Sequence, residues 1–268
     1  GDFSAKIMVK VGQLDSKDFP ANKKYAIPLS ITGASNYSLI PSQRSAILLL
    51  NRSILSSVAK VSGGEGIRIK PVGMHTKAEW TIQMSAIYSS LTRSNLTTAY
   101  LSNGTGGEFY TRISSTAGIQ VKNGRDGDDT WTQIPLQAGK WLHITYVHKD
   151  KKTTVYVNGK VQKVFENSAI TFGENSMIVV GNSGYRNDYL REIRLWDKAL
   201  TESEINDYLY LPMDPATPHL ISYLPLSKEM ETKDLKAPAG TENVTTKARI
   251  EYVENVKFPA DELVIVNQ

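Results

Sequence analysis

Apolar and polar residues alternate along much of the chain, in short runs that turn residues separate. Residues 3–11 (FSAKIMVKV) and 24–31 (KYAIPLSI) show this period of two, and residues 45–50 (SAILLL) add a short apolar run. Successive side chains of a β-strand point to opposite faces of a sheet, so this period predicts half-buried strands. The N-terminal region is therefore expected to hold three short strands.

The same pattern continues to the C-terminus. In residues 153–164 (TTVYVNGKVQKV), Asn158 and Gly159 separate two alternating runs and predict a type I′ hairpin turn. One helix is expected, because Thr201 and Glu204 have the spacing of a capping box. Further strands are expected over residues 66–70, 79–88, 98–101, 107–113, 118–122, 130–134, 141–148, 176–180, 190–196, 221–226, 249–252 and 263–266. Many short strands and one short helix predict an all-β sandwich.

Residues 56–66 (SSVAKVSGGEG) differ from the segments on either side, because they are small, polar and rich in Gly. Such a composition is typical of a connection between domains. We therefore expect a small β-domain over residues 1–60 and a larger β-domain over residues 61–268.

Composition narrows the function classes. The chain has 268 residues, no Cys, and a net charge of +4 from 31 basic and 27 acidic residues. Without Cys, disulfide frameworks, cysteine-ligated metal sites and thiol nucleophiles are excluded. The basic residues are scattered rather than arranged in a stripe with interleaved aromatic residues, so no nucleic-acid partner is expected. The longest apolar run, residues 46–50, is far shorter than the roughly 20 residues that cross a membrane.

Four stretches between residues 66 and 259 follow one ordered pattern. They are residues 80–86 (WTIQMSA), 139–146 (GKWLHITY) with 154–160 (TVYVNGK), 190–205 (LREIRLWDKALTESEI), and 220–226 (LISYLPL). This region resembles the laminin-G-like branch of the concanavalin A-like lectin/glucanase superfamily, with Leu224 where that family usually has Trp. The resemblance implies a jelly-roll sandwich.

The first 55 residues carry a second resemblance. Residues 24–32 (KYAIPLSIT) and 46–51 (AILLLN) are similar to the C-terminal half of a small β-sandwich domain of unknown function. That domain precedes laminin-G-like modules in surface lipoproteins of gut-bacterial glycan-utilisation systems, so we expect residues 1–60 to be an incomplete domain. The resemblance implies an outer-membrane lipoprotein at the cell surface. Its expected partners are a polysaccharide or glycan and other outer-membrane glycan-uptake proteins. The resemblance implies contact with the membrane only through a lipid anchor, which is absent from this chain.

Glycosidases share this fold, and retaining ones use two carboxylates about 5–5.5 Å apart. The glucanases carry Glu-x-Asp-x-x-Glu on one strand. The matching strand here has Glu192 but no acid two or four residues further on, and Glu192 and Arg194 are interpreted as outward-facing. His143 and His148 are expected on opposite faces of one strand, and no serine-nucleophile motif occurs. We therefore expect a protein that is not an enzyme.

Residues 123–129 (NGRDGDD) gather Asp126, Asp128 and Asp129 in one Gly-containing loop. Carboxylate oxygens in a flexible loop suit Ca²⁺, and the resemblance implies calcium near the rim of the sandwich. The alternative is an Asx-rich turn between two strands. Both a calcium site at these three residues and a metal-free turn remain open.

Carbohydrate binding uses exposed aromatic side chains beside amide and carboxylate groups. The loop over residues 181–189 holds such a set, namely Asn182, Tyr185, Arg186, Asn187, Asp188 and Tyr189. Trp131, beside the acidic loop, is a second candidate. The alternative is a packed loop in which Tyr189 turns into the core. Trp80, Trp141 and Trp196 stand in alternating strands and are expected in the core.

These residues and resemblances predict a non-catalytic cell-surface carbohydrate-binding protein of a glycan-utilisation system. The alternative is a structural or adhesive protein-interaction domain without a sugar site, and a glycoside hydrolase is less favoured. Exposed side chains at Tyr185 and Trp131 would favour the carbohydrate-binding protein over the protein-interaction domain. A pair of opposed carboxylates in a cleft would indicate a glycoside hydrolase.

Overall fold

The computed structural model describes residues 8–12, 17–20, 25–33, 36, 38–50, 53–64, 66–72, 78–91, 93–100, 109–122, 127–166, 170–173, 176–181 and 185–267. At residues 43, 93–100, 128, 185 and 186 only the backbone is described. The chain divides into two compact units, Gly1–Arg52 and Ser53–Gln268, which we call the hairpin unit and the sandwich unit. Each is described by itself.

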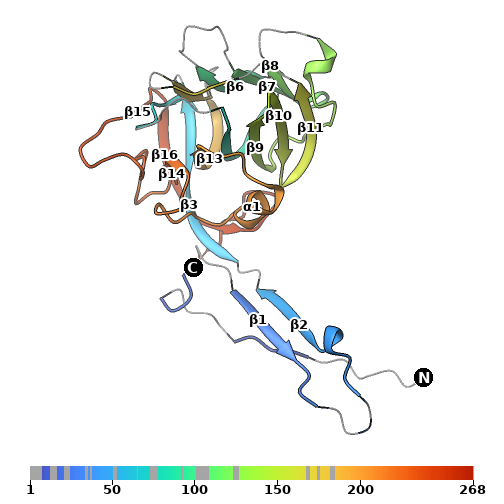
Figure 1. The fold of residues 1–268 in the computed structure, drawn as a ribbon. Helices are drawn as coiled ribbons and strands as arrows, with labels where there is room; N and C mark the ends of the chain where they lie inside the picture. Colours follow the sequence, from blue (N-terminus) through green and yellow to red (C-terminus); the bar gives the residue numbers. More distant parts are fainter. Residues whose placement is uncertain are drawn as a thin grey trace. The chain divides into compact units, whose positions relative to one another are not determined.

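The hairpin unit contains the antiparallel strands β1 (Tyr25–Ser30) and β2 (Ser45–Leu50), with a short 3₁₀ helix, η1 (Pro41–Gln43), before β2 (Figure 1). Two of the three strands expected here are therefore confirmed. The third, over residues 3–11, lies partly outside the described residues, and residues 8–11 form no strand.

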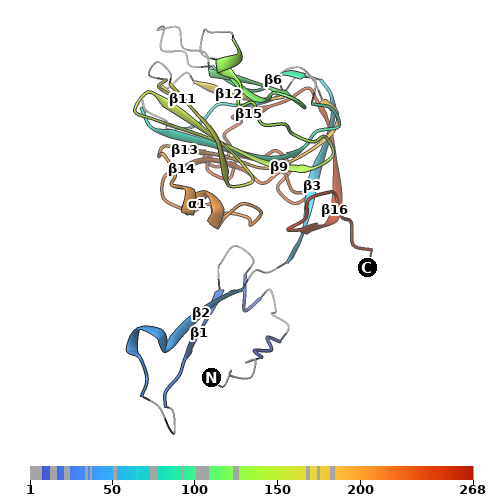
Figure 2. The ribbon, with the colours of Figure 1, turned by 90° about the vertical axis from the view of Figure 1, so that its right-hand side faces the viewer.

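The sandwich unit consists of two antiparallel sheets, which Figure 2 shows as two layers. The larger sheet has the order β11 (Lys160–Glu166), β10 (Lys152–Val157), β9 (Trp141–Lys149), β5 (Trp80–Ile87), β13 (Tyr185–Trp196), β3 (Ile54–Gly63) and β16 (Arg249–Phe258), and β14 (Leu220–Leu224) also pairs with β13. The smaller sheet has the order β15 (Val244–Thr245), β4 (Ile67–Ile69), β12 (Met177–Val180), β6 (Arg93–Tyr100), β7 (Phe109–Ser114) and β8 (Gly118–Lys122). The predicted all-β sandwich is confirmed.

The segment over residues 56–66, predicted as a linker, instead forms most of β3. This strand pairs with β13 on one side and with β16 on the other, and Val58, Ala59 and Val61 are fully buried. The small side chains that suggested a linker suit a strand enclosed between two neighbours. The sandwich unit accordingly begins before residue 60.

The core lies between the two sheets, around Trp80 of β5. Its indole ring packs edge-on against Phe109 and Phe172, stacks on the ring of His148, and donates from Nε1 to the Ile170 carbonyl. The predicted core position of Trp80 is therefore confirmed. Apolar side chains that face inward from both sheets fill the rest of this layer.

A second apolar cluster covers the outer face of the larger sheet, which is the face turned away from the smaller sheet. It includes Val147, Trp196 and Ile205, and helix α1 (Glu202–Asp207) lies over it (Figure 2). The predicted capping box is present, because the Thr201 side chain accepts from the Glu204 N–H and the Glu204 side chain from the Thr201 N–H. Both faces of the middle of this sheet, along β5 and β9, are therefore buried.

The predicted hairpin turn joins β10 and β11, with positive φ angles of 51° at Asn158 and 76° at Gly159. Two other predicted strands are wrong: residues 130–134 and 263–266 each form only an isolated bridge, at Trp131 and Ile265. In the described part of the chain, no helix is long and apolar enough to span a membrane.

Candidate binding pocket on the outer face of the larger sheet

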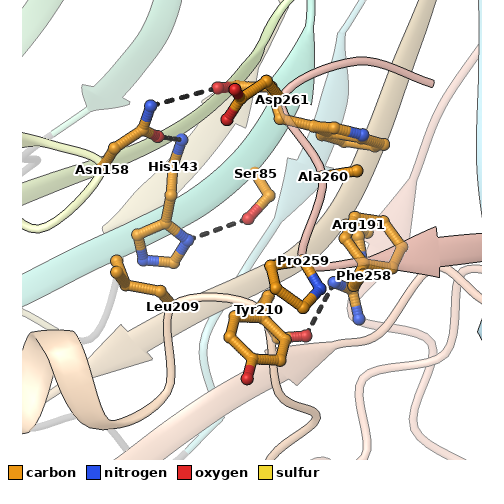
Figure 3. A pocket seen from close by; sticks show the side chains of 11 residues that line it. Ser85, His143, Asn158, Arg191, Leu209, Tyr210, Phe258, Pro259, Ala260 and Asp261 are labelled. Atoms are coloured by element: carbon orange, nitrogen blue, oxygen red, sulfur yellow. Dashed lines mark hydrogen bonds between the residues drawn. The ribbon is translucent and has the colours of Figure 1, made fainter. Parts of the chain in front are cut away.

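A pocket of about 210 Å³ opens on the outer face of the larger sheet. Strands β5, β9 and β13 supply its floor, and its walls come from Trp141 at the start of β9, from the residues that follow α1, and from residues 258–261 at and after the end of β16 (Figure 3). We call it the outer pocket. Its lining residues come from segments that lie far apart in the sequence. No local motif therefore predicted the pocket.

Ser85 and His143 face each other on the floor, with Ser85 Oγ 2.8 Å from His143 Nδ1 (Figure 3). The direction of this hydrogen bond follows from two neighbours. Trp196 Nε1, which can only donate, lies 2.8 Å from Gln83 Oε1, so the Gln83 amide nitrogen faces His143 Nε2 at 3.4 Å. His143 Nε2 must then accept, and the ring proton sits on Nδ1. The imidazole therefore donates to Ser85 instead of taking its proton.

The charge state of His143 agrees with this arrangement. Burial lowers the pKa of His143 well below its usual value, and the positive charges of Arg194 and Arg191 lower it further. His143 is therefore neutral at pH 7. Its backbone N–H donates to Asn158 Oδ1, so the hairpin turn also orients this strand.

Beneath the pocket, Glu192 lies between two buried arginines. Its Oε2 accepts from Arg194 Nη2 at 2.6 Å and from the Tyr223 hydroxyl at 3.0 Å, and its Oε1 lies 3.5 Å from Arg191 Nη2. Burial raises the pKa of Tyr223, so its hydroxyl stays protonated and donates. The cluster contains two guanidinium groups and one carboxylate.

A β-bulge places both arginines on the same face. Arg191 pairs with Ser85 and Arg194 with Gln83, so three steps along β13 match two along β5. Glu192, within the bulge, has a φ of +56°. Both side chains that were predicted to face outward, Glu192 and Arg194, do lie on the outer face, but they are buried rather than exposed.

The chain after α1 is the reason for that burial. Its carbonyl groups accept from the arginines: Tyr208 and Leu211 from Arg194, and Tyr210 from Arg191 at 2.9 Å. Charged residues between the apolar positions of a strand are typical of an exposed face, so no local signal indicated that these side chains are covered. The sequence does not show which segment covers them.

Trp141 and Phe258 form the aromatic wall, with ring centroids 5.1 Å apart, and the Arg191 guanidinium lies 4.0 Å from the Phe258 ring centroid. Trp141 is buried, as expected, but it lines the outer pocket and not the layer between the sheets. Its Nε1 is buried and has no hydrogen-bond partner among the described residues.

Family comparison agrees with this architecture. The family model described as "Concanavalin A-like lectin/glucanases superfamily" matches residues 62–206, which is more than half of the chain. This chain belongs to that superfamily. No protein with a curated description matches the sequence significantly.

One solved structure with a TM-score above 0.5 has the same fold. A candidate carbohydrate binding protein from Bacteroides ovatus ATCC 8483 aligns with a TM-score of 0.58 and 18% identity, over 90% of this chain and 71% of that one. Domain 4 of AbnA, a GH43 extracellular arabinanase from Geobacillus stearothermophilus, in complex with arabinotriose, aligns with a TM-score of 0.45 and 15% identity, over 68% and 86%. A heptameric SAP-like pentraxin from Limulus polyphemus aligns with a TM-score of 0.47 and 12% identity, over 75% and 94%.

The residues predicted to bind sugar do not form one group in the structure. Asn182 lies outside the described residues, and Tyr185 and Arg186 begin β13, where only their backbone is described. Asn187 is exposed at a bulge, with a φ of +62°. The predicted loop is therefore a strand from Tyr185 onward.

Asp188 and Tyr189 are less accessible than predicted. Asp188 has no exposed surface, and its Oδ1 accepts from the backbone N–H and the hydroxyl of Ser89 at 2.8 and 3.0 Å. It was expected in an exposed loop, but it holds β13 to Ser89, two residues after the end of β5. Tyr189 is half-buried. Trp131 is also half-buried and makes no described contact with this group.

The acidic loop is only partly described. Asp126 lies outside the described residues, and Asp128 and the exposed Asp129 belong to a short 3₁₀ helix, η2 (Asp128–Thr130). Lys163 Nζ donates to the backbone carbonyls of Asp129 and Trp131 at 2.8 and 2.7 Å, so a cationic side chain lies against this turn. Among the described residues, no three His, Asp or Glu side chains gather as a metal site. Calcium binding here stays a prediction.

Proposed function

We propose that this protein is a non-catalytic carbohydrate-binding protein, and that its outer pocket holds one sugar residue of a glycan. The observation that carries the proposal is the composition of the pocket, in which the rings of Trp141 and Phe258 stand beside the polar groups of Ser85 and Arg191. Ligand pockets combine apolar walls with a few placed polar groups, and aromatic rings can pack against the C–H faces of a sugar.

The pocket chemistry supports binding rather than catalysis. Glycoside hydrolysis needs two carboxylates that flank the bond. Among the described residues that line the pocket, Asp261 is the single acid, and Glu192 beneath it is held between two arginines. A serine nucleophile needs a base that accepts its proton, but His143 donates to Ser85.

A glycan array, followed by calorimetry on each hit, tests the proposal. Trp141→Ala should abolish binding, whereas Asn187→Ala, at the exposed bulge outside the pocket, should leave it unchanged. Loss of binding in Asn187→Ala alone would move the site to the predicted group at 182–189. Silence across plant, host and microbial polysaccharides would overturn sugar binding and favour the protein-interaction alternative.

Incubation of the bound glycans with the protein tests the absence of catalysis. We expect no new reducing ends over a day, measured against buffer alone. Release of products by the natural chain, and not by Trp141→Ala, would show that the protein is an enzyme.

We also propose that the protein works at a bacterial cell surface, as an outer-membrane lipoprotein beside other glycan-uptake proteins. The support is the resemblance of residues 24–51 to a domain of such lipoproteins. Protease treatment of intact native cells should degrade the protein, and survival under conditions that degrade a known surface protein would contradict this location.

We also propose that Asp126, Asp128 and Asp129 bind Ca²⁺, and the melting temperature tests this proposal. Adding Ca²⁺ to chelator-treated protein should raise the melting temperature, because a ligand of the folded state stabilises it. Asp126→Asn should abolish that rise. An unchanged melting temperature in the natural chain would show that the turn needs no metal.

A further inference from the structure

The hairpin unit exposes apolar side chains on both faces of its two-stranded sheet. In β2 the exposed fractions are 68% for Ile47, 37% for Leu48 and 72% for Leu49, and no residue from Ser45 to Leu50 is charged. Neighbouring side chains of a strand point to opposite faces. A two-stranded sheet alone is at best marginally stable in water, and exposed apolar patches mark interaction sites. The free side of β2 is therefore a candidate interface.

The hydrogen-bond pattern shows which backbone groups of β2 are open. The Ile31 N–H donates to the Arg44 carbonyl at 2.8 Å, so every second pair in this register exchanges hydrogen bonds. Ser45, Ile47 and Leu49 belong to the pairs between, and their N–H and C=O groups point away from β1. No other described strand pairs with that edge. These backbone groups can therefore bind an extended chain.

Other sheet edges of this protein are protected against such pairing. Pro28, which has no N–H, points its nitrogen to the outer edge of β1. In the sandwich unit, isolated bridges to Trp131 and Ile265 cover part of β8 and β16, and the edge strand β11 carries Lys160 and Glu166. Natural sheets use charges, prolines and covering segments in this way. The free edge of β2 has none of these protections among the described residues.

We propose that two copies of this chain pair through the free edges of β2, as antiparallel strands about a twofold axis. With Ile47 opposite Ile47 of the second copy, and Ser45 opposite Leu49, all three open positions form hydrogen-bonded pairs. The same register places Ile47 beside its counterpart on one face, and Leu48 beside Ala46 on the other. A twofold interface requires a self-complementary surface, and this uncharged strand supplies one. The product is a four-stranded sheet, and this pairing is independent of sugar binding.

Sedimentation velocity of the full chain tests the pairing, over a range from about 1 µM to about 1 mM that covers weak complexes. We expect a concentration-dependent change from 29.7 kDa to twice that mass. Hydrogen exchange should slow at the Ile47 and Leu49 amides as the dimer forms. A species of 29.7 kDa at every concentration would overturn the inference, whether or not a sugar binds. Protected amides in that monomer would show that another segment of the chain covers the edge.

Substitutions at Ile47 place the interface. Ile47→Pro removes an outward N–H and no hydrogen bond within the hairpin, because Ile47 and Pro28 form a pair that exchanges none. It should weaken dimerisation at least about tenfold, since each copy loses the donor of the central pair. Ile47→Lys should do the same by placing like charges opposite each other.

The control is Ile40→Lys, the same change at an exposed residue outside β2. It should leave the dimer unchanged. Dimerisation of both Ile47 variants at the natural strength would exclude pairing through this edge. An equal loss in Ile40→Lys would also exclude it, because the dimer would then depend on overall charge.

Discussion

In the middle of the larger sheet, along β5 and β9, the two faces are buried to a similar degree but differ in chemistry. Along β5, alternate residues face the smaller sheet and are apolar, while those between them, Thr81, Gln83 and Ser85, are polar and face outward. Thr81 Oγ1 donates to the Lys198 carbonyl at 2.7 Å, and Gln83 is fixed by Trp196. A period of two therefore marks the two sides of this strand but does not say that its polar side is exposed.

The difference also explains where a site can form. Burial of apolar side chains stabilises the inner face, but the hydrophobic effect does not fix the direction in which any one group points. On the outer face a buried polar group needs a partner in a defined direction, so the hydrogen-bond network orients Ser85 and Arg191. The inner face holds the sheets together, and the outer face can recognise a ligand.

The largest expected effect is on the outer face. Glu192→Gln should lower the free energy of unfolding by about 3–5 kcal/mol, because it leaves two buried guanidinium groups without a countercharge. The control is Glu254→Gln, which breaks the exposed pair between Lys228 and Glu254 and should cost about 0–1 kcal/mol. Urea denaturation measures both. A loss for Glu192→Gln no larger than the control would contradict the described network.

A truncation on the inner face should separate stability from binding. Ile82→Ala removes buried apolar volume between the sheets and should cost about 2–5 kcal/mol. Sugar affinity, measured well below the melting temperature, should stay unchanged because Ile82 points away from the outer pocket. An affinity loss beyond about threefold would show that the two faces are coupled.

Acid should destabilise the inner face through His148. Burial lowers the pKa of His148 to about 4, whereas an unfolded His has a pKa of about 6.5. Between these values the unfolded chain binds a proton that the folded chain does not, so stability falls as the pH drops from 6.5 towards 4. The loss between pH 7 and 4.5 should be about 2 kcal/mol from this residue. His148→Gln should lose correspondingly less over the same range, and equal losses in the two proteins would exclude this role.

The smallest effect concerns the helix that covers the outer face. Thr201→Ala removes the helix cap and should cost about 1 kcal/mol, while Thr201→Ser keeps the cap and should cost less. Hydrogen exchange should show faster opening of residues 202–207 with little change in β5. Faster exchange in β5 to the same extent would mean that helix and sheet open together.

Local patterns predicted the elements whose reasons are local. The turn at Asn158 needs only two residues that accept positive φ, and the helix cap at Thr201 needs only its neighbour Glu204. The segment over residues 56–66 was mistaken for a linker because small residues suit both a connection and an enclosed strand. Asp188 was expected in an exposed sugar-binding loop, but its donor, Ser89, lies elsewhere in the sequence, so no local pattern indicated its burial.

The sequence by itself determined the all-β class, most of the strands, the hairpin turn and the capped helix, because these depend on side-chain period and on backbone preferences within a few residues. Only the tertiary structure decided that the polar side of β5, β9 and β13 is covered, that His143 is neutral and donates, and that Trp141 lines a pocket. Those properties depend on the chain after α1 and after β16, which the topology brings to the outer face. Burial and hydrogen-bond direction are set by such distant partners, and no local pattern encodes them.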